Sequence, residues 1–173
     1  MRPTAGDYPE YFDRYISLVY EHDIVALLNA QASSVHAALS GLSETRAGSR
    51  YAEGKWSIRE LLGHIVDTER VFAYRALAIA RGETYSLPSF DENEYAAHSR
   101  HDRYPIDELA EEFATLRRSS VLFFMHLDEA DLRRTGTVNG QPMSVLALAF
   151  IMAGHVRHHA RICSERYGIA VRA

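Results

Sequence analysis

The chain has 173 residues, a length that fits one domain over 1–173 and buries roughly two-thirds of the surface exposed on unfolding. Hydrophobic residues make up 47% and charged residues 24%, which excludes a disordered chain. The net charge of −4 lacks the basic excess that nucleic acid binding requires. The one cysteine, Cys163, excludes an internal disulfide and a zinc site built from cysteine pairs.

Neither the N-terminus nor the apolar runs indicate export or membrane insertion. The first residues, MRPTAGDYPEYFDRY, contain no apolar core of the kind that a signal peptide needs. The longest apolar run, residues 145–153, is far shorter than the ~20 residues of a membrane span. We therefore expect a cytoplasmic protein with no membrane partner.

Two amphipathic helices are predicted in the first half of the chain. Residues 9–19 form a short helical lead-in, and a long helix over 21–42 carries apolar residues at three- and four-residue steps. After a polar connection over 43–54, Ser57 and Glu60 form a capping box that begins a second long helix. Gly82 follows its end, as a glycine commonly does.

Two more helices are predicted after a long loop. Residues 82–104 read as a loop, and a loop of this length is usually functional or a lid. Pro105 begins the third helix, and residues 128–142 connect it to the fourth, with a small turn at Asn139-Gly140. The fourth helix runs over 144–167, and Gly168 closes it. Four such helices predict an all-α fold, a four-helix bundle.

Histidine is the unusual residue, with nine in the chain. His155 and His159 stand four apart in the apolar seam of the fourth helix, so both imidazoles can reach one metal ion. His64 on the second helix is a candidate third ligand. Gly63 and Gly154 precede His64 and His155, and we expect each glycine to allow close helix approach. Three histidines leave coordination positions open, as in catalytic sites.

Other polar residues have competing interpretations. Asp67 and Glu69 flank the turn of His64 and would orient a ligand or accept a proton; a solvated salt bridge with Arg70 or Arg59 is the alternative. We expect His158 to be exposed, with a spare ligand or a hydrogen-bond donor as alternatives, and Cys163 to pack as a small hydrophobe. The remaining histidines read as surface or satisfied core residues: His22, His36, His98, His101 and His126.

Several segments together resemble the DinB-like (YfiT-type) family. They are KWSIRELLGHIVDTER (residues 55–70), FAYRAL (72–77), LPSFDEN (87–93) and AGHVRHH (153–159), within a resemblance that spans about residues 15–167. The resemblance implies an up-down-down-up bundle, a homodimer, and a divalent metal (Zn, Ni, Fe or Mn) held by His64, His155 and His159. It gives Asp91-Glu92-Asn93 no chemical role.

The resemblance also implies an activity, because several members are metal-dependent transferases that use a thiol such as bacillithiol or mycothiol, and others are described as hydrolases. We expect a metal-dependent enzyme, of thiol S-transferase or hydrolase type, acting on a small-molecule substrate. In it the metal would lower the pKa of a thiol or water that then attacks an electrophile. The alternatives are a non-catalytic metal-binding stress-response bundle and, third, an interaction protein whose histidines only pack in the core.

Overall fold

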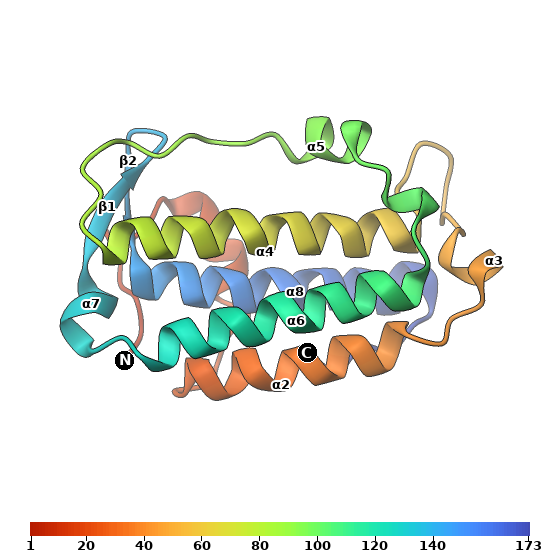
Figure 1. Cartoon of the computed structure of the whole chain (residues 1–173), viewed down its shortest axis with the longest axis horizontal. Coiled ribbons are helices and arrows are strands. Elements are labelled where there is room, and N and C mark those ends of the chain that lie inside the picture. The colour runs from red at the N-terminus through yellow and green to blue at the C-terminus, as the bar shows by residue number, and fades with distance from the viewer.

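The computed structural model describes all 173 residues and holds four long helices packed side by side. These are α2 (Ile24–Leu39), α4 (Ile58–Ala80), α6 (Ile106–Met125) and α8 (Val145–Tyr167). In Figure 1, α2 and α8 run in one direction and α4 and α6 in the other, so the order is up-down-down-up. The predicted all-α four-helix bundle is confirmed, with one small β-hairpin added to it.

The ends of the long helices follow local side-chain chemistry. Ser57 and Glu60 form the predicted capping box of α4, and Gly82, with φ of +82°, follows its end. The Ser144 side chain accepts a hydrogen bond from the Ala147 amide at the start of α8, and left-handed Gly168 ends that helix. The α2 helix is shorter than the predicted 21–42, because Asp23 caps it at the Ala26 amide and the chain leaves helical geometry at Ser40.

Short elements lie in the predicted helical lead-in and in the segments that were predicted as connections. The lead-in contains η1 (Glu10–Phe12) and α1 (Asp13–Ile16), and the predicted connection over 43–54 contains α3 (Glu44–Ala47). Between α6 and α8 lie α7 (Glu129–Arg133) and a hairpin of β1 (Thr135–Val138) and β2 (Gln141–Ser144). The predicted Asn139-Gly140 turn joins these strands, and both residues have positive φ.

The predicted loop over 82–104 is partly helical. It contains α5 (Glu92–His98) and η2 (His101–Arg103), and the Asp91 side chain caps α5 by accepting from the Asn93 and Glu94 amides. Leu87 forms a bridge with Val138, which ties the segment to the hairpin. The whole stretch carries the chain back along the bundle, so that α6 starts at the same end as α4 (Figure 1).

A buried polar layer divides the apolar interior into two clusters. One cluster includes α8 residues up to Ala153, and the other begins on α8 at Val156. Between them lies Arg117, a fully buried side chain from α6. Its guanidinium donates to Glu69 Oε2 of α4 at 2.8 Å and to Gln31 Oε1 of α2 at 2.7 Å. The network therefore joins three long helices, and Gln31 extends it to the fourth through the Ala153 carbonyl of α8 at 3.0 Å.

Most apolar side chains of the long helices pack against one another within the bundle. No helix of this chain combines the length and the hydropathy that crossing a bilayer would take.

Candidate metal centre

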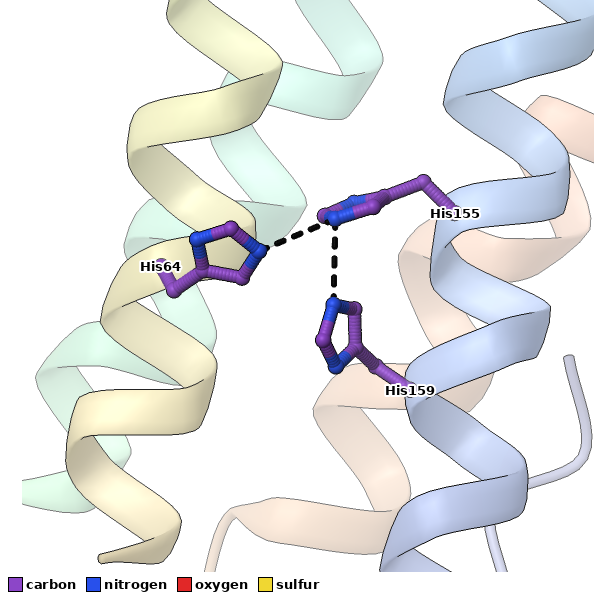
Figure 2. Close-up of side chains that lie close together, drawn as sticks. All are labelled: His64, His155 and His159. Atoms are coloured by element: carbon purple, nitrogen blue, oxygen red, sulfur yellow. Dashed lines mark hydrogen bonds between the residues drawn. The ribbon is translucent and has the colours of Figure 1, made fainter. Parts of the chain in front are cut away.

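Three histidine side chains converge between α4 and α8. Figure 2 shows His64 reaching from α4 toward His155 and His159, which lie one turn apart on α8. The Nε2 atom of His155 is 3.0 Å from Nε2 of His64 and 3.0 Å from Nε2 of His159. Ligand nitrogens from all three side chains lie within 4.8 Å of one another. The structure thus brings together the three residues that the sequence singled out.

Aromatic neighbours pack against the His64 and His155 rings. The Trp56 ring lies 4.9 Å from the His64 ring, and the Tyr15 ring lies 5.3 Å from that of His155, edge to face. Phe72, two turns after His64 on α4, lies 6.4 Å from the His155 ring. These contacts restrict rotation of the His64 and His155 imidazoles.

The two glycines beside the histidines let different neighbours come close to α4 and α8. A Cβ at Gly154 would lie 2.1 Å from the Tyr15 carbonyl oxygen, so this glycine admits the backbone of α1 against α8. A Cβ at Gly63 would lie 2.2 Å from the His101 ring, so this one admits a side chain from η2. The expected close helix approach is found at Gly154, whereas Gly63 makes room for a side chain.

Burial keeps the three imidazoles neutral at physiological pH. It lowers the pKa of His64 to about 4, with a smaller effect from the charge of His158. It also lowers the pKa of His155 and His159 well below the usual value, and neighbouring histidines add to the shift. A neutral imidazole has a free lone pair on one ring nitrogen, which is the form that binds a metal.

A divalent cation fits this donor set. Three Nε2 atoms that face one another cannot all find hydrogen-bond partners within the trio, because each neutral ring offers one N–H at most. The buried Nδ1 atom of His159 has no hydrogen-bond partner either. Ligand nitrogens about 2.0–2.1 Å from a tetrahedral ion stand about 3.3 Å apart, close to the two separations of 3.0 Å found here.

The histidines form part of the wall of a cavity of about 490 Å³. Its lining is largely aromatic, and its carboxylate-bearing residue is Glu92 of α5, which neighbours the Asp91 cap. All three histidines reach this cavity, so the trio is open on one side. A structural metal site is typically closed by four protein ligands, whereas a catalytic site keeps a position open to the substrate.

The structure places Asp67 and Glu69 away from the three histidines. Glu69 is buried in the polar layer, where it pairs with Arg117 and accepts a hydrogen bond from Ser120 at 2.8 Å. Asp67 lies 3.9 Å from His101 and 3.8 Å from Arg70. Neither carboxylate therefore makes the expected contact with His64. The alternative prediction, a salt bridge, is found between Asp67 and Arg70.

Three other residues had predicted environments that the structure tests. Cys163 is buried as expected, and burial raises the pKa of its thiol to about 11. His158 is half-buried rather than exposed: it lines the cavity, with its ring 5.1 Å from that of His159. His101, which was expected to be a surface or a satisfied core residue, is buried against Gly63 because η2 folds onto α4.

Sequence reasoning missed two polar residues of the cavity wall. Thr68 and Arg75 follow His64 on α4 by four and eleven positions, so they share its helix face together with Phe72. That spacing was readable in the sequence. A threonine and an arginine in a helix are ordinarily solvent-facing, however, and only the folded chain shows both to be buried.

Comparison with known proteins assigns the fold and the family. The structure of YfiT from Bacillus subtilis, described as a "probable metal-dependent hydrolase with an unusual four-helix bundle topology", superposes with a TM-score of 0.74 at 15% identity, covering 97% of this chain and 94% of YfiT. At that identity the likeness establishes the fold alone.

Similar sequences carry names of the same kind. A protein of Oceanobacillus iheyensis is 22% identical over 80% of both chains, and one of Geobacillus kaustophilus is 24% identical over 82% of both. Both are named "Putative metal-dependent hydrolase". The family model of the DinB superfamily matches residues 27–163, a region that includes all three converging histidines. The chain therefore belongs to the DinB superfamily.

Proposed function

We propose that this protein is a metal-dependent enzyme that acts on a small molecule bound between α4, α8 and the segment over 82–104. The observation that carries the proposal is the convergence of three neutral Nε2 atoms on the wall of an open cavity. His64, His155 and His159 would hold one divalent ion of Zn, Ni, Fe or Mn. Such an ion supplies Lewis acidity and lowers the pKa of a water or thiol that binds to it.

The cavity wall limits the groups that can move protons. Neither Asp67 nor Glu69 faces the cavity, so a hydrolytic reaction would use His158 or Glu92 as proton acceptor. Of these two, His158 packs directly against His159. The names of the relatives support a hydrolase. A thiol S-transferase of the bacillithiol or mycothiol type is the other form of the proposal, and it needs no separate base if the metal holds the thiolate.

The test of the metal site is elemental analysis of untagged protein beside single histidine variants. We expect about one transition-metal ion per chain, lost in His64→Ala, His155→Ala and His159→Ala. His22→Ala, in an exposed turn before α2, serves as the matched control and should retain the metal. Wild-type protein that cannot be loaded with any of the four metals would refute the proposal.

A second comparison separates the enzyme from a non-catalytic metal-binding bundle. Loaded wild-type protein is incubated with activated esters, and separately with a thiol and an alkylating electrophile. An enzyme gives turnover in one of the two assays that disappears in His155→Ala. Metal binding with no turnover in either assay, together with a large loss of thermal stability on metal removal, would favour the non-catalytic bundle.

A further inference from the structure

Arg75 is a buried cation without an acidic partner. Only 4% of its surface is exposed, yet no aspartate or glutamate lies within ion-pair distance of it. Its guanidinium donates one hydrogen bond, to the Pro88 carbonyl at 2.7 Å, and lies 5.5 Å from the centres of the Phe72 and Phe90 rings. A guanidinium has five N–H donors, so most of its hydrogen-bonding capacity is left without a protein acceptor.

The contrast with the other buried arginine of the bundle shows how unusual this is. Arg117 is balanced by the Glu69 carboxylate and by the Gln31 amide oxygen. Burial of a charge is costly unless the charge is paired and hydrogen-bonded. The Arg75 guanidinium contacts only two aromatic rings and one backbone carbonyl. It also lines the cavity of about 490 Å³. The partner that it lacks can reach it from that cavity.

A stripe along α4 connects Arg75 to the three histidines. His64, Thr68, Phe72 and Arg75 are all buried and all line the cavity. The Phe72 ring lies between the histidines and Arg75, 6.4 Å from the His155 ring of α8 and 5.5 Å from the Arg75 guanidinium. The buried hydroxyl of Thr68 has no hydrogen-bond partner. The stripe thus has polar groups at its two ends, with the Thr68 hydroxyl and the Phe72 ring between them.

We propose that the cavity binds a small organic carboxylate, with its anionic end on Arg75, its apolar body along Phe72 and Phe90, and its other end near the histidines. One planar guanidinium matches one planar carboxylate, and the aromatic walls match an apolar body. This inference rests on the proposed function only in placing the reacting group at the histidines. Recognition of the carboxylate by Arg75 does not depend on a bound metal.

The test uses a matched pair of probes, 5-phenylpentanoate and 5-phenylpentanamide, which differ in charge but hardly in shape. Their dissociation constants are measured by calorimetry on the full chain, both loaded with zinc and after treatment with EDTA. We expect wild-type protein to bind the acid about 10- to 100-fold more tightly than the amide. The preference should survive zinc removal, because it arises at Arg75.

Two variants locate the preference. Arg75→Met keeps most of the side-chain packing and removes the charge, so it should abolish the preference for the acid and leave amide binding unchanged. The matched control is Arg70→Met on the same helix, where the arginine is half-exposed and pairs with Glu112; it should bind like wild type. Far-ultraviolet circular dichroism checks that both variants fold.

The outcomes separate this inference from the proposed function. Equal binding of acid and amide by wild-type protein, or no binding of either, overturns the inference even if Arg75→Met fails to fold. A preference that is unchanged in Arg75→Met also overturns it, because the acid then binds the metal if zinc is required, or Arg14, the other arginine of the cavity wall, if it is not. An Arg75-dependent preference in a chain that takes up no metal would support the inference while the proposed function fails.

Discussion

At the scale of single residues, Arg75 and Arg117 are buried charges of which the sequence pattern gave no sign. Arg117 has the largest side chain among the fully buried residues, and its partner Glu69 lies 48 positions away in the sequence. Periodicity identifies apolar faces, but it gives no sign that an arginine within such a face has a distant carboxylate. The three histidines were predictable because two stand one turn apart in an apolar seam. Arg75, Arg117 and the role of Glu69 were not.

Removal of the Glu69 charge should strongly destabilise the fold. Glu69→Gln leaves the buried Arg117 charge without its counter-ion, and breaking such a pair costs about 3–5 kcal/mol. The free energy of unfolding from urea titration measures this loss. Glu129→Gln, which breaks an exposed pair with Arg133, is the control and should have a far smaller effect. Equal losses in the two variants would contradict the assigned role of Glu69.

A second residue-level prediction concerns acid stability. Hydrogen bonds from Arg157 lower the pKa of Glu21 to about 2, from an ordinary value near 4.5. The unfolded chain therefore takes up this proton at higher pH than the folded chain, so the stabilisation is complete above about pH 4.5 and is lost as the pH falls toward 2.

Glu21→Gln tests that dependence. Because the Glu21 side chain is 41% exposed, we expect a loss of at most about 1 kcal/mol at pH 7. The difference between variant and wild type should shrink on acidification, as measured by thermal unfolding at a series of pH values. A difference that stays constant down to pH 2 would show that the charge of Glu21 is not involved.

At the scale of elements, long helices were predictable and short ones were not. Capping residues and apolar stripes located α4 and α8 almost to the residue. The short helices α3, α5 and α7 also begin at caps, from Ser43, Asp91 and Asp128. Each is too short to show helical periodicity, however, so its cap resembled a turn residue in a polar loop. The hairpin was predictable only at its Asn139-Gly140 turn, because four-residue strands show little alternation.

The contact of α1 with α8 gives a prediction at this scale. In Gly154→Ala the new Cβ would meet the Tyr15 carbonyl, and the backbone of α1 must move. Overpacking of this kind costs about 1–3 kcal/mol, which exceeds the gain of about 1 kcal/mol in helix propensity. Gly63→Ala meets Cβ and the ring of His101 instead, so η2 must move and a loss is expected there too. Thermal unfolding of both variants measures the losses, and an unchanged Tm in Gly154→Ala would contradict the close contact with α1.

At the scale of the whole molecule, the site depends on the bundle topology. The up-down-down-up order makes α4 and α6 parallel, so the segment between them must return along the full length of the bundle (Figure 1). This segment supplies Pro88, Phe90 and Glu92 to the surroundings of the cavity. The number of long helices was predictable from the sequence. The directions of these helices came from the family resemblance, because a stripe of apolar residues carries no direction.

The proposed metal site predicts a metal-dependent stability of the whole chain. An ion that binds only the folded state at 100 times its dissociation constant stabilises that state by about 2.7 kcal/mol. For a chain of this size this raises Tm by about 5–10 °C. Differential scanning calorimetry with and without zinc measures the shift, and His155→Ala should abolish it. A shift of the same size in His155→Ala would place the ion elsewhere.

The distance in sequence between the two helices that carry the histidines affects how the protein is made. His64 and His155 are 91 residues apart, and at about 5–20 residues per second a ribosome needs about 5–18 s to pass from one to the other. During that interval the emerging chain has one of three imidazoles and no pocket. Loading with the proposed ion would therefore follow the synthesis of α8, and an incomplete chain would not withdraw metal from the cell.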